Sequence, residues 1–496
     1  MDTERPNVLL LLADQWRGDC LGFDGHPVVK TPHIDELFLN GTHFRNAYSA
    51  CPTCIPARAS LWTGQSGRSL GLVGYDHQFP WNFSHTLAST LADAGYHTQL
   101  VGKMHASPTR SLVGFHNVVL HDGTLGYHRR APLDYTQFDD YSAWLRERLG
   151  CDTDLRDTGL GVNSWVVNPW PYEERYHPTN WVATQSIEFL KRRDPGKPFF
   201  LTASFVRPHP PFDPPAYHLD RYLNRELPEP PVGDWVKDPE DKQRLGLQAS
   251  FGRGKVDEEQ LRLARAAYYA LITHVDHQIN RFLFSLADHG VGSNTLILFA
   301  GDHGELLGDH HLWAKSMPFE GSARIPLVIK PPRNGHALRG HQADAVVELR
   351  DLYPTICDFC AVEAPPEVEG HSLRGICEGR GEKVRDWLHG EHFFGPESNH
   401  WIYDGRYKYA WFSQTGGELL FDLEEDPQEL QNLAPLDPPP LQRLRSLLIE
   451  RLADAPEGFV QEGRLVAERA QSALVPGRLE GPPKAPGRSA RGSSAP

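Results

Sequence analysis

Two unbroken apolar runs, each followed by polar residues, constrain the fold more than any other feature. Residues 7–14 read Asn-Val-Leu-Leu-Leu-Leu-Ala-Asp, and residues 295–302 read Thr-Leu-Ile-Leu-Phe-Ala-Gly-Asp. Runs of this kind are typical of strands that are buried on both faces of a mainly parallel sheet. In such sheets, ligands bind in the crevice at the carboxyl ends of the strands. The two runs therefore predict that Asp14 and Asp302 meet at one ligand-binding edge.

Helical and strand patterns alternate over most of the chain. Apolar residues recur at helical spacing over 84–95, 179–191 and 258–287, and strands are expected over 96–101 and 198–205. This alternation predicts the α/β class, with a large, mixed and mainly parallel central sheet that is flanked by helices.

The sequence changes character near residue 386. Short alternating segments with glycine turns follow, and residues 441–453 read as a helix. We expect an α/β domain over 1–385 and an α+β subdomain over 386–465, in which a small antiparallel sheet packs with one helix. Residues 466–496 are rich in Gly, Pro, Ser and Arg, which predicts a disordered tail.

Two stretches, 106–175 and 213–256, show no regular period, and they are expected to form loops and a surface excursion. Long loops on an α/β scaffold usually build or cover a substrate pocket. Residues 347–360 have mixed apolar spacing and are expected to form a helix.

Charge and composition exclude several classes of protein. The net charge of −14 opposes nucleic-acid binding, which needs a basic surface, but a local basic pocket could still hold a small anion. No window approaches the roughly 18 apolar residues of a membrane span, and the first residues lack the apolar core of a signal peptide. Seven cysteines, an odd number, do not make a disulfide framework. We expect a cytoplasmic protein with no nucleic-acid or membrane partner; a homo-oligomer is left open.

Two pairs of cysteines have the spacing of a redox pair or of half a zinc site. They are Cys51 with Cys54, and Cys357 with Cys360. The second pair ends a helix-like stretch, which favours two small buried apolar side chains. A helix that begins at Ala57 would place Cys54 beside a helix N-terminus, where backbone N–H groups favour an anion.

Cys54 also begins the pattern Cys-x-Pro-x-Arg, which Thr63 and Gly64 follow. This pattern resembles the signature of type I, formylglycine-dependent sulfatases, which belong to the alkaline phosphatase superfamily. Other motifs resemble those of the family and stand in the same order. They are Pro6-Asn7 with Asp14-Gln15, Gly102-Lys103-Met104-His105, Pro208-His209-Pro210, Gly301-Asp302-His303-Gly304, and Lys315 followed by Glu320 and Arg324. In detail they are closest to choline-sulfatase-like and phosphonate monoester hydrolase-like members.

The resemblance implies a metal-dependent sulfuric ester hydrolase of the arylsulfatase kind. A formylglycine-generating enzyme would oxidise Cys54 to formylglycine, whose hydrated aldehyde would attack the sulfur of a small anionic ester. The implied metal ligands are Asp14, Gln15, Cys54, Asp302 and His303. The implied catalytic residues are Cys54, Arg58, Lys103, His105, His209 and Lys315. Among them, His209 would protonate the leaving alcohol, His105 would be a base, and the lysines and arginine would supply positive charge.

Gln15 and His303 depart from the pattern of many sulfatases, which have two aspartates at the first position and Asp-Asn at the second. The change removes a negative charge and adds a nitrogen ligand, so the single divalent ion could be Ca²⁺ or Mn²⁺, with a shift toward Mn²⁺. The same pair resembles the phosphonate monoester hydrolase and phosphodiesterase branch, which is the alternative function. A non-catalytic binding protein is disfavoured because every expected site residue is present.

Overall fold

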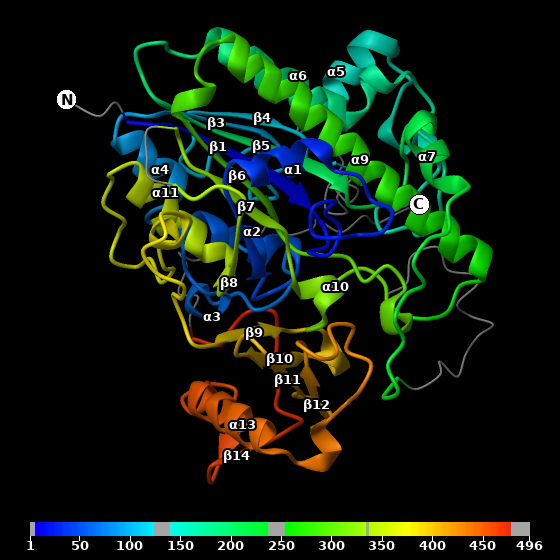
Figure 1. Ribbon diagram of the computed structural model, residues 1–496, viewed down its shortest axis with the longest axis vertical. Coiled ribbons are helices and arrows are strands. Elements are labelled where there is room, and N and C mark those ends of the chain that lie inside the picture. The colour runs from blue at the N-terminus through cyan, green and yellow to red at the C-terminus, as the bar shows by residue number, and fades with distance from the viewer. Residues whose placement is uncertain (1–4, 124–138, 237–252, 334–336, 478–496) are drawn as a thin grey trace, which may run out of the picture.

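An eight-stranded sheet runs through the centre of the computed structural model, which describes residues 5–123, 139–236, 253–333 and 337–477 (Figure 1). The strands lie in the order β4-β3-β5-β1-β6-β7-β2-β8. Their bounds are β1 Asn7–Asp14, β2 Thr42–Tyr48, β3 His97–Gly102, β4 Asn117–Leu120, β5 Phe199–Pro208, β6 Thr295–Gly301, β7 Leu327–Lys330 and β8 His341–Glu348.

The two apolar runs form neighbouring central strands, as predicted. β1 lies between β5 and β6 and is parallel to both. Among the described strands of this sheet, only β7 runs in the opposite direction: it pairs antiparallel with both of its neighbours, β6 and β2. The prediction of a mixed, mainly parallel sheet is therefore confirmed.

Helices cover both faces of the sheet, because alternate residues of β1 point to opposite sides. The face of Leu9 and Leu11 packs against α1 (Pro32–Leu39), α5 (Asp140–Leu149), α6 (Pro178–Arg192), α7 (Ala216–Leu223) and α9 (Glu258–Asp288). The face of Val8 and Leu10 packs against α2 (Cys54–Thr63), α4 (Leu87–Asp93), α11 (Leu352–Phe359) and α12 (Arg374–Cys377). The short helices α3 (Gly67–Leu70) and α10 (Glu320–Ala323) lie in connections. Within the described ranges, no helix combines the length and apolar character needed to cross a membrane.

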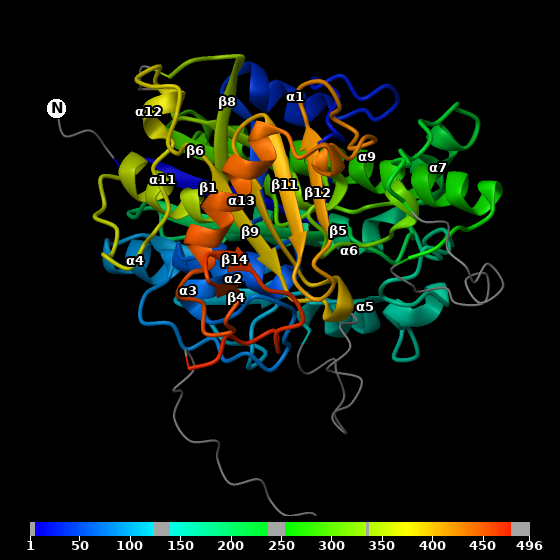
Figure 2. The same cartoon turned by 90° about the horizontal axis from the view of Figure 1, so that it is seen from below.

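A smaller antiparallel sheet follows, in the order β12-β11-β10-β9, and α13 lies across it (Figure 2). One face packs on the leucines of α13, and the other packs on Tyr48, Met317 and Phe319 of the larger part. The predicted antiparallel sheet and helix are therefore present. Their bounds are β9 Leu388–His392, β10 Asn399–Tyr403, β11 Tyr407–Phe412, β12 Glu418–Asp422 and α13 Pro439–Leu452, and the small pair β13 Val460–Gln461 and β14 Arg464–Leu465 comes last.

Two stretches contain more regular structure than their patterns predict, and a third contains a shorter helix than predicted. β4 and α5 lie within 106–175, and α7 lies within 213–256. The expected helix over 347–360 begins as the end of β8 and becomes α11 only at Leu352. These elements are short, so each buries only a few side chains and the apolar period is too brief to recognise.

The disordered tail was predicted to begin at residue 466, but residues of this stretch make contacts with the rest of the protein. The N–H of Val73 donates to the carbonyl of Ala473 (2.8 Å), and the N–H of Val475 donates to that of Gly71 (2.9 Å). Val475 is buried. The chain from 466 to 477 is therefore ordered against the α3 region, because a few apolar residues among the polar ones pair with it. The rest of the predicted tail, 478–496, lies outside the described residues.

The N-terminus of α1 is capped by a residue from another helix. The side chain of Thr31, at the N-cap, accepts no hydrogen bond from the helix. Asp276 of α9 accepts hydrogen bonds from the backbone N–H groups of Ile34 (2.9 Å) and His33 (3.2 Å) instead. It thereby satisfies two donors that the helix leaves unpaired.

Replacing Asp276 with alanine is expected to lower the free energy of unfolding by about 1–2 kcal/mol, the usual cost of losing a helix cap. Urea denaturation measures the change. Asp288→Ala, at the exposed end of the same helix, is the matched control and should stay within about 0.5 kcal/mol of the wild type. Equal effects of the two changes would argue against the capping role.

Candidate active site

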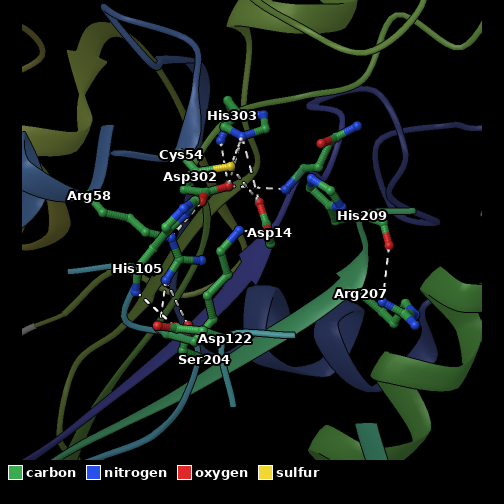
Figure 3. Close-up of polar contacts among 12 residues, drawn as sticks. Asp14, Cys54, Arg58, His105, Asp122, Ser204, Arg207, His209, Asp302 and His303 are labelled. Carbon is green, nitrogen blue, oxygen red and sulfur yellow. Dashed lines mark hydrogen bonds and ion pairs between the residues drawn. The ribbon is translucent and has the colours of Figure 1, made fainter. Parts of the chain in front are cut away.

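The carboxyl ends of β1 and β6 bring three buried side chains together (Figure 3). Asp14 ends β1, and Asp302 and His303 follow β6 directly. His303 Nε2 lies 3.6 Å from Asp14 Oδ1 and 3.8 Å from Asp302 Oδ1. With the sulfur of Cys54, these ligand-type atoms all lie within 4.8 Å of one another. The two strand ends thus meet at one edge, as the apolar runs predict.

Cys54 occupies the first turn of α2. The helix begins at Cys54 itself, three residues before the predicted start at Ala57. Its sulfur lies 3.2 Å from His303 Nε2 and 3.6 Å from Asp14 Oδ1. Because the first N–H groups of a helix lack backbone acceptors, this position favours an anion or an oxyanion at the Cys54 side chain.

Arg58 lies one turn further along α2 and connects four elements of the site. Its Nε donates to Asp302 Oδ2 (2.8 Å), and its Nη1 donates to the carbonyl of Lys103 (2.7 Å) and to Ser204 Oγ (2.9 Å). The side chains of Arg58 and Asp302 are both fully buried. Arg58 therefore fixes α2 against the ends of β3, β5 and β6.

Gly102 and Lys103 stand at the end of β3. Gly102 has a φ of +101°, and a Cβ atom there would lie 2.0 Å from the carbonyl oxygen of Ser204. Only glycine fits this close approach of two strands. The turn sends the buried Lys103 ammonium to Asp14 Oδ2, with which it forms an ion pair. Although burial opposes it, this lysine holds the pKa of Asp14 well below its usual range.

His105 is held in an unusual backbone conformation, with a φ of +64°. The N–H groups of Met104 and His105 both donate to Asp122 Oδ1 at 2.9 Å. The imidazole Nε2 lies 3.5 Å from the hydroxyl of Tyr75. Asp122 thus supports a left-handed residue that would otherwise be unfavourable.

A chain of hydrogen bonds connects Glu305 to His209. Glu305 accepts from the amide nitrogen of Gln15, and the amide oxygen of Gln15 accepts from Lys315 Nζ. Lys315 Nζ lies 2.8 Å from His209 Nε2, and His209 Nδ1 donates to the carbonyl of Pro210 (2.7 Å). The carbonyl fixes the tautomer: His209 carries its proton on Nδ1 and accepts from Lys315 at Nε2.

The site shifts the pKa of the Cys54 thiol downward. Burial, followed by Asp14, raises this pKa. Lys103, Lys315 and His303 outweigh both, so the pKa lies below its ordinary value. The same positive charges would favour an anionic group of a substrate at this position.

Both histidines beside the cavity are neutral at pH 7. Burial, followed by Lys103, lowers the pKa of His105 well below its usual range. Burial, followed by Lys315, does the same for His209. A neutral imidazole can accept a proton, which is what a general base requires.

A cavity of about 490 Å³ opens over Cys54. Its lining includes four polar groups of the site, which are Cys54, His105, His209 and Lys315. Aromatic side chains dominate the walls, and they are Tyr75, Trp165, Phe212, Trp313 and Phe394. Trp165 comes from 106–175 and Phe212 from the proline-rich turn after β5, so the first irregular stretch does contribute to the pocket, as expected.

Every predicted site residue lies at this edge of the sheet, but four supporting residues were missed. They are Tyr75, Asp122, Ser204 and Glu305. Glu305 follows the predicted ligands by two residues, and Ser204 lies near the end of a predicted strand. Their place at carboxyl strand ends was a usable signal, whereas nothing in the sequence around Tyr75 points to the site.

The second cysteine pair has no part in the site. Cys357 lies in α11 and Cys360 caps its C-terminus; both are buried in the core, and burial raises the pKa of each to about 12. Among the described residues, neither belongs to a group that could hold a metal ion. The prediction that they are small buried side chains is confirmed.

The donor set fits a divalent cation. A cation with bonds of about 2.1–2.5 Å separates neighbouring ligands by about 3–4 Å, which matches the 3.6 and 3.8 Å separations around His303. Two carboxylates and one imidazole offer oxygen and nitrogen atoms to such an ion. The two carboxylates are otherwise balanced by Lys103 and Arg58. A buried carboxylate–imidazole cluster beside a cavity that Cys54, two histidines and Lys315 line is an arrangement typical of hydrolases that act on anionic esters.

Comparisons with known proteins identify the family. The sulfatase family model matches residues 6–361, and the model of the N-sulphoglucosamine sulphohydrolase C-terminal region matches residues 308–457. The chain is 48% identical to an arylsulfatase of Clostridium perfringens, over 93% of this chain and 97% of that protein. It is 32% identical to a choline-sulfatase of Rhizobium meliloti, over 88% and 83%. The chain belongs to the sulfatase family.

A solved structure agrees with this assignment at the level of the fold. The phosphonate monoester hydrolase of Agrobacterium radiobacter superposes with a TM-score of 0.74 at 28% identity, over 90% of this chain and 95% of that one. The alkaline-phosphatase-like architecture is thus shared with the branch that the sequence suggested as the alternative.

Proposed function

We infer that this chain is a sulfuric ester hydrolase, and we propose that its nucleophile is a formylglycine made from Cys54. The position of Cys54 carries the proposal: its sulfur lies among Asp14, His303 and the lysines on one side and borders the aromatic cavity on the other. When the thiol has been replaced by an aldehyde, the hydrated form supplies a hydroxyl group that can attack sulfur.

We propose that Asp14, Gln15, Asp302 and His303 hold one divalent ion together with the modified Cys54 side chain. The ion would neutralise ester charge and lower the pKa of the attacking hydroxyl. The imidazole of His303 adds a nitrogen to an oxygen-rich set, which favours Mn²⁺ over Ca²⁺. The amide of Gln15 is oriented by Glu305 so that its oxygen points toward Lys315 and the floor of the site.

The remaining residues of the site would bind the sulfate group and move protons. Lys103 pairs with Asp14 and Lys315 contacts Gln15, so both ammonium groups lie beside proposed metal ligands, where they would bind the sulfate oxygens. Arg58 would hold α2, and with it Cys54, in place. His105 is neutral and borders the cavity, so it suits a base that helps the second hydroxyl expel sulfate.

The leaving alcohol would take its proton from the pair formed by Lys315 and His209. His209 Nε2 accepts from Lys315, and its Nδ1 proton is fixed on the carbonyl of Pro210. A proton that reaches Nε2 therefore makes an imidazolium, which is a much stronger acid than the neutral ring. The anionic substrate would favour that positive charge.

His209→Asn is expected to slow alkyl sulfates far more than nitrophenyl sulfate. An alkoxide needs protonation to leave, whereas a nitrophenolate does not, so kcat should fall by about 100-fold or more for the first and about tenfold or less for the second. Steady-state assays with both esters measure the difference. Equal losses on the two substrates would exclude His209 as the general acid.

We propose that aromatic sulfate esters are the preferred substrates. Five aromatic residues surround the cavity, and a flat apolar ring buries well against such walls. Similarity to the arylsulfatase of Clostridium perfringens points the same way. The alternative is a phosphonate monoester hydrolase or phosphodiesterase with the same nucleophile. Its support is the structural likeness to a phosphonate monoester hydrolase, at 28% identity, which is weaker than the 48% identity to the arylsulfatase.

Aryl sulfate, choline sulfate and a phenyl phosphonate ester, assayed side by side on metal-loaded enzyme, test the proposal. We expect kcat/KM to be highest for the aryl sulfate. A preference for the phosphonate ester would overturn the assignment, and a preference for choline sulfate would overturn the aromatic substrate class alone.

A formylglycine-generating enzyme is the proposed maturation partner. Cys54 is buried in the folded chain, with 2% of its surface exposed. We therefore propose that modification precedes folding of α2. The cytoplasmic location remains a prediction from the sequence, and a homo-oligomer stays an open alternative.

A further inference from the structure

A second cluster of ligand-type side chains lies outside the active site. It is formed by Glu174 of the short 3-10 helix η4 (Glu174–Tyr176), His218 of α7 and His274 of α9. One ligand atom from each residue lies within 4.8 Å of the other two. We propose that these three side chains bind a divalent transition-metal ion of the zinc class, separate from the catalytic ion.

The distances fit metal coordination better than direct hydrogen bonds. Glu174 Oε1 lies 3.5 Å from His274 Nε2, and Glu174 Oε2 lies 3.7 Å from His218 Nε2. Hydrogen bonds between nitrogen and oxygen are typically about 2.7–3.2 Å long. Two ligands at about 2.1 Å from a tetrahedral zinc ion lie about 3.4 Å apart. The carboxylate and the two imidazoles are therefore spaced as ligands of one ion.

Burial of the two imidazoles also needs an explanation. His218 and His274 expose at most 2% of their surfaces, and their rings stack at a centroid distance of 4.7 Å. In the described part of the chain, the Nδ1 atom of each has no hydrogen-bond partner. Buried polar groups are normally paired. A cation bound at the Nε2 atoms would give each ring one strong partner and would fix its proton on Nδ1.

The chemistry of the donors selects the kind of metal. Two imidazoles and one carboxylate suit zinc and similar first-row ions, whereas calcium and magnesium prefer oxygen ligands alone. His274 Nε2 also donates to the amide oxygen of Asn180 (2.6 Å). Metal binding at Nε2 would displace that proton, and the Asn180 side chain would then move away, because 2.6 Å is shorter than the spacing between two ligands of one ion. The side chain of Glu174 is 37% exposed, which gives the ion a path from solvent.

The ion would stabilise the wall of the substrate cavity. η4 follows the segment that carries Trp165, and α7 follows the turn that carries Phe212. α9 carries Tyr268, whose hydroxyl donates to the carbonyl of Gln15 (2.7 Å). A metal bond among the three elements would hold two cavity walls against the helix that supports the active-site strand.

Metal stoichiometry tests the proposal. Chelator-treated wild-type protein, equilibrated with excess Zn²⁺ and desalted, is expected to retain one more zinc per chain than Glu174→Gln. Glu174 lies at the exposed rim, so this variant should fold, and His218→Gln gives a second independent measurement. Titration with Zn²⁺ should show at least a tenfold weaker affinity for this second site in each variant.

His289→Gln is the matched control, because it removes a histidine at the C-terminal end of the same helix, away from the cluster. It should retain the full zinc content and the rise in Tm on adding Zn²⁺, both of which the Glu174 and His218 variants should lose in part. Co²⁺ bound to the wild type should add a visible absorption band that is absent from Glu174→Gln. Equal zinc content and equal Tm shifts in wild type and Glu174→Gln would overturn the proposal.

Discussion

Replacing Cys54 with alanine is expected to reduce kcat/KM for an aryl sulfate by at least about 1,000-fold. Alanine cannot be converted to an aldehyde, so the variant lacks the proposed nucleophile. The surrounding Asp14, His303 and Lys103 remain in place, and they would still bind the ester. The loss should therefore appear in kcat, and sulfate should still bind as an inhibitor.

Cys51→Ala is the matched control for this prediction. Cys51 is buried three residues before Cys54 and takes no part in the site, so its replacement should keep most of the activity. Mass spectrometry of the peptide that contains both cysteines should show an aldehyde at Cys54 alone after co-expression with the modifying enzyme. Full activity in Cys54→Ser, or an unmodified Cys54 thiol in active enzyme, would exclude the formylglycine mechanism.

The central sheet could be predicted because its strands are buried on both faces. A strand such as β1 must be apolar at every position, so Asn7–Asp14 is recognisable without any knowledge of its neighbours. α5 and α7 were missed for the opposite reason. Each has few buried residues, and its position depends on contacts that a local pattern does not contain: α7 packs against α9, and α5 packs against β4.

The same division applies to the site. Asp14, Asp302 and Cys54 follow strands or begin a helix, so topology alone brings them to one edge of the sheet. The chain of contacts from Glu305 through Gln15 and Lys315 to His209 joins residues up to 300 positions apart. The aromatic walls of the cavity likewise depend on how irregular segments fold over the sheet. Motifs therefore predicted which residues gather at this edge, whereas the contacts among them and the aromatic lining of the cavity needed the structure.

Arg58→Ala is expected to destabilise the fold by about 3–5 kcal/mol, a cost typical of removing one partner from a buried ion pair. Arg58 and Asp302 are fully buried, and the guanidinium also donates to the carbonyl of Lys103 and to Ser204 Oγ. Its loss leaves the Asp302 carboxylate without this partner. It also removes the side chain that links α2 to the residues at β3, β5 and β6. Chemical denaturation of chelator-treated protein measures the effect.

An exposed ion pair provides the matched comparison. Arg45 Nε lies 2.9 Å from Asp344 Oδ1, which is close to the 2.8 Å between Arg58 Nε and Asp302 Oδ2. Unlike that buried pair, the side chains of Arg45 and Asp344 are largely exposed to solvent. Arg45→Ala should therefore cost no more than about 1 kcal/mol. A divalent ion would take over part of the charge of Asp302, so adding Mn²⁺ should recover stability in Arg58→Ala and leave the Arg45→Ala difference unchanged. If Arg58→Ala and Arg45→Ala lower the free energy of unfolding by similar amounts, the buried ion pair contributes no more than an exposed one. Arg58 would then not be needed to hold Asp302 in place.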